Sequence, residues 1–231
     1  MARSALLGNS LVKKYWMALT GLFLVSFLAM HLAGNLQLLD GSPNGRENFN
    51  QYADFMTTFP VVKVVSYLLY FSILFHSFDG LLLALQNRKA RGRQRYAYEN
   101  SGANSHWYAR RMALLGTLIL AFIVLHMGNF WYKYHWGDIP MVEHESGKAY
   151  KDLYSVVEAS FQRSWYVAIY LVSMAILAFH LLHGFQSAFQ SLGINHGRYT
   201  PWIRNFGVFF AVVVPIFFAL IPVWMFFNAH Q

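Results

Sequence analysis

Five apolar stretches, each long enough to cross a lipid bilayer as a helix, constrain this chain more than any other feature of its sequence. They lie near residues 15–38, 61–86, 112–132, 165–191 and 206–227. A helix needs about 20 residues to span the hydrocarbon core. Charged residues make up only 12% of the chain, against roughly 25% in a soluble domain. The pattern predicts an all-α, polytopic membrane protein with five transmembrane helices, forming one domain over residues 1–231.

Basic and acidic residues are segregated between the loops, which predicts an orientation in the membrane. If the N-terminus is cytoplasmic, the cytoplasmic segments hold twelve of the 18 basic residues: Arg3, Lys13, Lys14, Arg88, Lys89, Arg91, Arg93, Arg95, Arg110, Arg111, Arg198 and Arg204. The opposite loops, 39–60 and 133–164, hold eight acidic residues: Asp40, Glu47, Asp54, Asp138, Glu143, Glu145, Asp152 and Glu158. Cytoplasmic segments of membrane proteins carry an excess of Lys and Arg, so we predict a cytoplasmic N-terminus. The net charge of +8 then requires no nucleic-acid partner.

Cysteine is absent from the sequence, whereas histidine occurs ten times. The absence excludes disulfides, thiolate zinc sites, iron–sulfur ligation and cysteine nucleophiles in this chain. A metal bound here must therefore be held by histidine, methionine or carboxylate side chains.

An internal repeat relates the first two apolar stretches to the next two. Residues 17–31 read MALTGLFLVSFLAMH and residues 112–126 read MALLGTLILAFIVLH. Residues 75–86 read FHSFDGLLLALQ and residues 179–190 read FHLLHGFQSAFQ. We therefore predict that helices one and two repeat as helices three and four, in the same order and membrane direction.

Each of the first four stretches contributes one histidine to this repeat: His31, His76, His126 and His180. A histidine inside a membrane helix is costly unless it is paired or liganded. An interhelical hydrogen bond would explain a single one. Four histidines, one per helix and matched by the repeat, favour a set of ligands.

Position along the helices sorts these histidines into two pairs. His31 and His126 lie within nine residues of the outer ends of their stretches, roughly 10 to 14 Å at about 1.5 Å per residue. His76 and His180 lie in the inner part of the bilayer. We predict the pairs His31–His126 and His76–His180, and two stacked bis-histidine sites are typical of two low-spin b-type haems.

Four glycines keep fixed distances from the four histidines. Two follow the inner histidines by four residues and two precede the outer histidines by ten: Gly80, Gly184, Gly21 and Gly116. The first two share a helix face with their histidine, and the other two lie about 15 Å nearer the cytoplasm, level with the inner haem. We predict haem contacts for all four, with close helix packing as the alternative.

Other polar residues near the inner pair each have two interpretations. His183 follows His180 by three residues and occupies the repeat position of Asp79. We predict that His183 bonds a haem propionate or a water, and that Asp79 plays the matching part. Lys14 and Arg111, at cytoplasmic helix ends, would neutralise inner-haem propionates or anchor the helices by snorkelling. The remaining histidines, expected to face solvent, are His106, His135, His144, His196 and His230.

With these residues the chain resembles, along nearly its whole length, the five-helix di-haem cytochrome b subunit of succinate dehydrogenase and fumarate reductase, the b558 type. The resemblance is carried by the histidine in each of helices one to four, by FHLLHGFQSAFQSLG at 179–193 and by FHSFDG at 75–80. In that family the first and third helices hold the distal haem and the second and fourth hold the proximal one. The depth argument gives the same pairs independently.

The resemblance implies a membrane anchor in the bacterial cytoplasmic membrane, bound to two soluble subunits. One would be a flavoprotein carrying FAD and the dicarboxylate site, and the other an iron–sulfur protein. Their docking surface would be the basic segments 88–111 and 197–204, whose charge a plain positive-inside bias explains equally well. The enzyme would be succinate dehydrogenase or fumarate reductase, with association of whole complexes left open.

The resemblance also implies a quinone site near the distal haem, for menaquinone rather than ubiquinone, with protons supplied by an acidic residue near the outer surface. Glu47, Tyr52 and Asp54 are the acidic or phenolic candidates in the corresponding loop. Asn35 and Asn129 follow the outer histidines by four and three residues. They would hydrogen-bond a quinone or a propionate, or cap their helix ends.

Two other functions remain open. Di-haem cytochrome b subunits of hydrogenases, formate dehydrogenases and nitrate reductases also pair histidines, and would dock other soluble partners. A transporter whose membrane histidines relay protons would hold no haem. One histidine on each of four successive helices, in a two-helix repeat, favours the succinate dehydrogenase and fumarate reductase family over these two alternatives.

Overall fold

The computed structural model describes residues 10–92, 105–144 and 147–228, and these are mostly helical. In chain order the elements are α2 (Ser10–Asn35), η1 (Leu36–Leu39), α3 (Gly45–Thr58), α4 (Pro60–Arg91), α6 (Trp107–Arg110), α7 (Met112–His126), η2 (Met127–Tyr132), α8 (Lys133–Trp136), β1 (Met141–Glu143), β2 (Ala149–Lys151), α9 (Leu153–Phe161), α10 (Ser164–Ser191) and α11 (Thr200–Asn228). The predicted loop residues Arg3, Arg93, Arg95, Glu145 and His230 lie outside the described residues.

Five helical segments are long and apolar enough to cross a membrane, as the sequence predicts. They are Leu11–Leu39, Pro60–Arg91, Met112–Trp136, Ser164–Ser191 and Thr200–Asn228. The third is continuous through a π-helical segment, η2, that begins directly after His126. The segments extend one to six residues beyond their predicted ranges at one or both ends, where flanking residues also adopt helical structure.

Local sequence explains where several helices begin, end and bend. Pro60 opens α4, where a missing N–H costs nothing. Gly92 ends it with φ of 70°, a left-handed conformation that favours glycine. Pro215 and Pro222 lie inside α11, which stays helical through both, as membrane helices braced by neighbours can.

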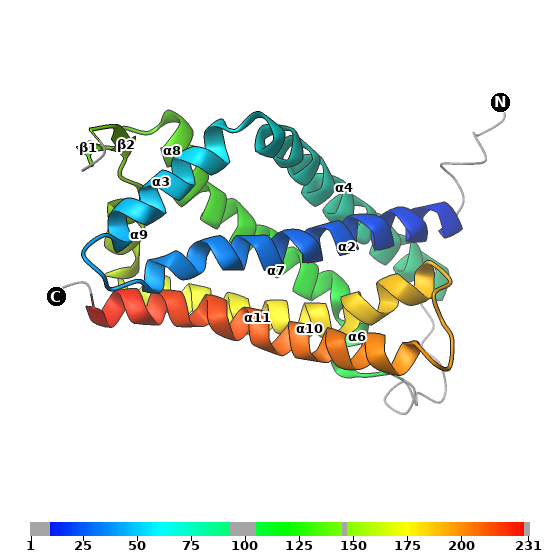
Figure 1. Ribbon diagram of the computed structural model, residues 1–231. Helices are drawn as coiled ribbons and strands as arrows, with labels where there is room; N and C mark the ends of the chain where they lie inside the picture. Colours follow the sequence, from blue (N-terminus) through cyan, green and yellow to red (C-terminus); the bar gives the residue numbers. More distant parts are fainter. Residues whose placement is uncertain (1–9, 93–104, 145–146, 229–231) are drawn as a thin grey trace.

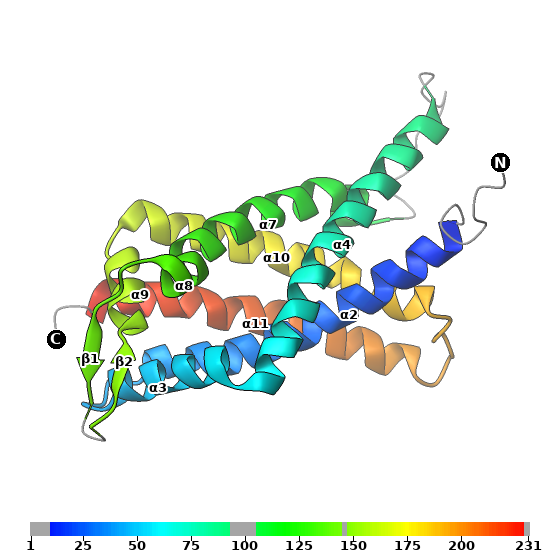
Figure 2. The same ribbon diagram turned by 90° about the horizontal axis from the view of Figure 1, so that it is seen from above.

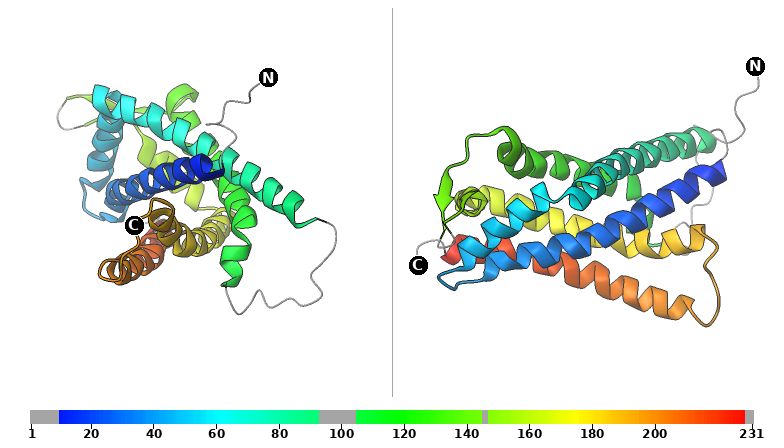
Figure 3. Two further views of the ribbon diagram at one scale, coloured as in Figure 1. Left: turned by 90° about the vertical axis from the view of Figure 1, so that its right-hand side faces the viewer. Right: turned by 45° about the horizontal axis from the view of Figure 1, so that its top comes forward.

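The long helices run side by side between two ends of different character (Figure 1). α10 packs against α11, α2 and α7, and α2 packs against α4; Figure 2 shows α4 crossing α2 and α7 lying beside α10. Because five helices span the molecule, the first turn of α2 and the last turn of α11 lie at opposite ends (Figure 3).

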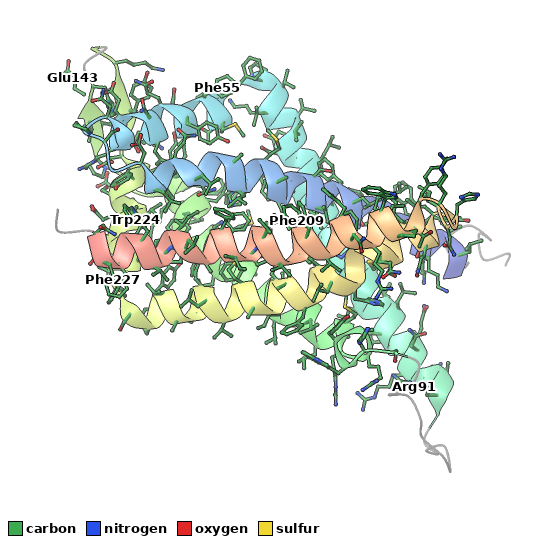
Figure 4. All side chains as sticks on the ribbon, turned by 60° about the horizontal axis from the view of Figure 1, so that its bottom comes forward. Phe55, Arg91, Glu143, Phe209, Trp224 and Phe227 are labelled. Atoms are coloured by element: carbon green, nitrogen blue, oxygen red, sulfur yellow. The ribbon has the colours of Figure 1, made fainter. Side chains whose placement is uncertain are left out.

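We call the end that carries α3, α8, α9 and the β1–β2 hairpin the capped end, and the other the basic end. The hairpin is an antiparallel pair of three-residue strands with Val142 opposite Tyr150. It was not expected from the sequence, because strands this short leave no alternating pattern. Figure 4 places Glu143 and Phe55 at the capped end and Arg91 at the basic end.

Within the described part of the chain, most basic residues lie at one end, and Arg46, Lys133, Lys148, Lys151 and Arg163 lie among the acidic residues of the other. The basic end holds Lys13, Lys14, Arg88, Lys89, Arg91, Arg110, Arg111, Arg198 and Arg204. The capped end holds Asp40, Glu47, Asp54, Asp138, Glu143, Asp152 and Glu158. Large apolar side chains between the ends are exposed on α11, including Phe209 at 60% and Phe217 at 40%, as expected for a helix that faces lipid.

Candidate functional site

The four repeat-matched histidines meet in two pairs. The rings of His31 on α2 and His126 on α7 have centroids 5.8 Å apart and planes at 89°. The rings of His76 on α4 and His180 on α10 have centroids 6.3 Å apart and planes at 69°. These are the pairs that the depth argument predicts, and their role as ligands stays a prediction.

The two pairs are stacked along the helices. Thr20 and Gly21 of α2 lie against His76, and Gly21 is ten residues from His31. At about 1.5 Å per residue the pairs are therefore roughly 15 Å apart along α2. The His31–His126 pair lies nearer the capped end, because α2 and α7 end at Asn35 and His126 on that side.

Aromatic rings enclose the His31–His126 pair. Phe27 stacks on His31 at 5.0 Å, and Phe218 of α11 lies 5.6 Å from it. Phe122 and Phe130 lie 5.8 and 5.3 Å from the ring of His126. Both histidines are half-buried, and the apolar rings leave the imidazole nitrogens as the main polar groups of the pair.

Hydrogen bonds involve the Nδ1 atom of both outer histidines. His126 Nδ1 lies 2.9 Å from the hydroxyl of Tyr170, which in turn lies 3.3 Å from the hydroxyl of Tyr166. Asn35 donates from Nδ2 to the carbonyl of His31 at 2.8 Å, and the same atom lies 3.3 Å from His31 Nδ1. Contacts at Nδ1 leave Nε2 as the nitrogen available to a metal.

The inner pair has a different set of contacts. Thr20 donates its hydroxyl to the carbonyl of Trp16 at 2.7 Å, and its oxygen lies 3.3 Å from His76 Nδ1. The Nδ1 atom of His180 is buried without a hydrogen-bond partner among the described residues. The polar contacts of the inner pair thus lie at His76, which also has a hydrogen bond to the backbone of Met17.

Two of the four predicted glycines lie directly against the inner histidine rings. A Cβ at Gly21 would lie 3.3 Å from Cε1 of His76, and one at Gly116 would lie 3.8 Å from Cε1 of His180. Each helix that carries an outer histidine thus presents a glycine to an inner one. The other two do not mediate close helix packing: a Cβ at Gly184 would meet nothing within 4 Å, and one at Gly80 only the end of Met17 at 3.6 Å.

The remaining residues predicted near the inner pair lie on the expected elements. Asp79 is buried on α4 at 6% exposed, and His183 is half-buried on α10. Lys14 and Arg111 are exposed, one near the start of α2 and one directly before α7. Both basic residues lie at the basic end, which is consistent with propionate contact and with snorkelling alike.

The acidic and phenolic candidates all lie on α3, over the capped end. Glu47 accepts a hydrogen bond from Gln51 at 2.9 Å and lies 3.4 Å from His144, and Asp54 pairs with Lys148 at 2.9 Å. Tyr52 packs onto the backbone of Gly34, one helical turn after His31. Burial raises the pKa of Tyr52. Of the three, Tyr52 therefore lies nearest the His31–His126 pair along α2.

Asn129 has structural contacts instead of a free amide. It donates to the hydroxyl of Ser160 at 2.7 Å and accepts from Lys133 at 2.8 Å. It therefore links η2 to α9, and the expected capping of a helix end at this position is wrong because η2 continues into α8. Asn35, by contrast, bonds the last turn of its own helix.

The expectation that His144 faces solvent is wrong. Its side chain is only 5% exposed, because the hairpin folds it onto Glu47 and the ring of Tyr150. His106, His135 and His196 are exposed as expected.

A polar cluster that the sequence did not indicate joins α3 to the start of α9, with Asp152 and Asn50 buried and Arg46 exposed. Asp152, 1% exposed, accepts hydrogen bonds from Arg46 and, at 2.9 Å, from Asn50. It also caps α9 through the backbone N–H of Ser155 at 3.4 Å. Burial acts to raise the pKa of Asp152, but the hydrogen bonds from Arg46, Asn50 and Ser155 outweigh it and hold the pKa below its usual value.

The histidine pairs fit the geometry of a metal held between two imidazoles. A metal about 2.0–2.1 Å from one nitrogen of each ring requires ring centroids roughly 6 Å apart. The observed separations of 5.8 and 6.3 Å agree with this. The apolar enclosure, the contacts at Nδ1 and the glycines beside the inner rings suit a haem better than a bare ion, which would attract further ligands.

Comparison of the chain with protein-family models, with curated proteins and with solved structures finds no match.

Proposed function

We propose that this chain is the membrane-anchor cytochrome b subunit of a succinate:quinone oxidoreductase and binds two haems b. The observation that carries the proposal is the pair of stacked bis-histidine contacts, His31 with His126 and His76 with His180. Each contact joins helices that are not consecutive in the chain, α2 with α7 and α4 with α10. All four helices are therefore needed to form the two contacts.

The contacts of the inner histidines support the two-helix repeat. Gly21 lies against His76, and Gly116 lies against His180. Helix pairs α2–α4 and α7–α10 thus make the same contact, at positions that match in the sequence repeat. Common descent of the two halves explains this more simply than chance.

Charge supports an orientation with the basic end in the cytoplasm. Most described basic residues lie there, while the capped end mixes acidic residues with Arg46, Lys133, Lys148, Lys151 and Arg163; an excess of Lys and Arg marks the cytoplasmic side. The His76–His180 pair is then the inner, proximal site. The His31–His126 pair is the outer, distal one.

The chain's own residues would hold the iron and shape its surroundings. The four histidines supply the axial nitrogens, while Thr20 and Tyr170 occupy Nδ1 of His76 and His126. Phe27, Phe122 and similar rings surround the outer site with apolar surface. When bound, each haem would take up and release one electron at a time.

The basic end offers the surface for the soluble partners. Arg88, Lys89 and Arg91 are exposed at the end of α4, and Arg110, near the start of α7, is exposed as well. Such a surface attracts the acidic face of an iron–sulfur subunit. That subunit would bring its clusters, and with it a flavoprotein would bring FAD and the dicarboxylate site.

The capped end would bind and reduce a quinone, with menaquinone as the substrate. Tyr52 lies against Gly34 close to the outer pair, and Glu47 and Asp54 lie on the same helix toward the surface. The phenol would orient a quinone oxygen, and the carboxylates would exchange protons with the outside. We place no catalytic role on Asn129, whose amide is already bonded.

The test is a reduced-minus-oxidised spectrum of the purified chain with haem quantification by pyridine haemochrome, repeated on His31→Ala, His76→Ala and the exposed control His196→Ala. Two haems b per chain are expected in the natural sequence and in the control. Each of the first two variants should lose a different haem. A chain without haem would overturn the proposal and favour a proton-coupled transporter.

Reduction by substrate in native membranes separates the related functions. Succinate should reduce both haems, and a menaquinol analogue should reduce the outer one first. Reduction by hydrogen or formate, with none by succinate, would instead assign the chain to another quinone-linked dehydrogenase.

A further inference from the structure

Among the side chains of the described part of the chain, that of Tyr170 makes the shortest hydrogen bond to any of the four histidine rings. Its hydroxyl lies 2.9 Å from Nδ1 of His126, whereas the contacts at Nδ1 of His31 and His76 measure 3.3 Å. The Nδ1 atom of His180 has no partner among the described residues. The outer pair therefore has a shorter hydrogen bond from a side chain than the inner pair, whose His76 contacts Thr20 and the backbone of Met17.

A metal at Nε2 of His126 would fix the direction of this hydrogen bond, and the surroundings of Tyr170 limit its other partners. Tyr170 is 6% exposed and packed among Phe122, Phe130 and Phe161. When Nε2 of His126 binds a metal, Nδ1 carries the proton and donates it to the phenolic oxygen. The proton of Tyr170 then has the hydroxyl of Tyr166, 3.3 Å away, as its acceptor.

Successive hydrogen bonds such as these, from His126 to Tyr170 to Tyr166, are cooperative. A phenol that donates to a second hydroxyl becomes a better acceptor for the first donor, and low local polarity increases the effect. An acceptor at Nδ1–H raises the basicity of Nε2 toward the metal. A more basic axial nitrogen stabilises ferric over ferrous iron and so lowers the midpoint potential.

We propose that Tyr170, supported by Tyr166, is a positioning residue that orients the His126 ring and lowers the midpoint potential of the outer haem relative to the inner one. The inference rests on the proposed function, because it requires haem at the His31–His126 pair. It would give two similar bis-histidine sites different potentials without a change of ligand. It also explains why a hydroxyl lies buried among aromatic rings on α10, where phenylalanine would pack equally well.

The experiment is a redox titration of the haem spectrum and a low-temperature EPR spectrum of the purified di-haem protein. The variants are Tyr170→Phe, Tyr166→Phe and the exposed control Tyr67→Phe on α4, which is 71% exposed. Tyr170→Phe is also made in the His76→Ala background, where only the outer haem remains. In that background a measured midpoint potential belongs to the outer haem, because no second haem contributes to the spectrum.

Tyr170→Phe should increase the ferrous-to-ferric ratio of the outer haem at a given potential by up to about tenfold. This corresponds to a rise of up to about 59 mV in the midpoint potential of a one-electron couple. The low-field EPR signal of the same haem should move, and the inner haem should not change. Tyr166→Phe should give a smaller shift of the same sign, and Tyr67→Phe none. An unchanged outer potential and EPR signal in Tyr170→Phe would overturn the inference and leave the proposed function standing.

Two further outcomes are also decisive. If Tyr170→Phe loses the outer haem, Tyr166→Phe decides, because an upward shift there supports the inference and no shift overturns it. If the natural sequence binds no haem, the proposed function fails and this inference fails with it.

Discussion

At the scale of single residues, Gly21 leaves room for the ring of an inner histidine. A Cβ at this position would lie 3.3 Å from Cε1 of His76, and larger side chains would displace the ring. We expect Gly21→Val to lose the haem held by His76 and His180 and to keep the other, so that haem per chain falls from two to one. Haem quantification checks this, with Gly197→Val as the control, because a Cβ at Gly197 meets nothing within 4 Å. Retention of both haems would contradict the placement of Gly21.

Asp152 gives a second prediction at this scale. Asp152→Ala removes hydrogen bonds with Arg46, Asn50 and Ser155, and hydrogen bonds to charged groups contribute about 1.5–3 kcal/mol. We expect a loss of about 2–3 kcal/mol in the free energy of unfolding. Thermal unfolding in detergent measures it, and Asp138→Ala, at a residue outside this cluster, is the control.

The same carboxylate predicts a pH dependence. The pKa of Asp152 is lowered in the folded protein by Arg46, Asn50 and Ser155, against the effect of burial. Its contribution to stability is therefore complete above the unfolded value of about 3.9 and is lost as the pH falls through the lower folded value. The natural sequence should lose thermal stability more steeply below about pH 4 than Asp152→Asn. Parallel curves for the two would refute this.

At the scale of elements, the histidine-bearing helices and the capped end contribute differently. The four histidines lie on α2, α4, α7 and α10, whereas the hairpin contacts the capped end through pairs such as Lys148 with Asp54 and His144 with Glu47. We therefore expect replacement of residues 141–151 by a Gly-Ser linker of equal length to retain both haems and to lower the unfolding temperature. Haem content and thermal unfolding measure the two effects separately. Loss of either haem would show that the hairpin is needed to position the histidine-bearing helices relative to one another.

The sequence predicts the long helices well and the capped end poorly, for a physical reason. A membrane span is defined by about 20 successive apolar residues, which is a local property, and the paired histidines follow from the same register. Asp152 bonds Asn50 and Arg46, which precede it in the chain by 102 and 106 positions. No local pattern encodes such a contact, and the same holds for Tyr170 beside His126, 44 positions away. The spacing of Tyr166 and Tyr170, four residues apart on one face of an apolar helix, was the available signal.

At the scale of the whole molecule, the absence of cysteine makes the orientation directly testable. Single cysteines can be introduced at Asp138, at the capped end, and at Arg198, at the basic end. Because the basic end should face the cytoplasm, a membrane-impermeant maleimide should label Asp138→Cys in intact cells and Arg198→Cys only after lysis. The natural sequence gives the unlabelled control. Labelling of Arg198→Cys in intact cells, with Asp138→Cys protected, would invert the molecule and move the His31–His126 pair, and with it the proposed quinone chemistry, to the cytoplasmic side.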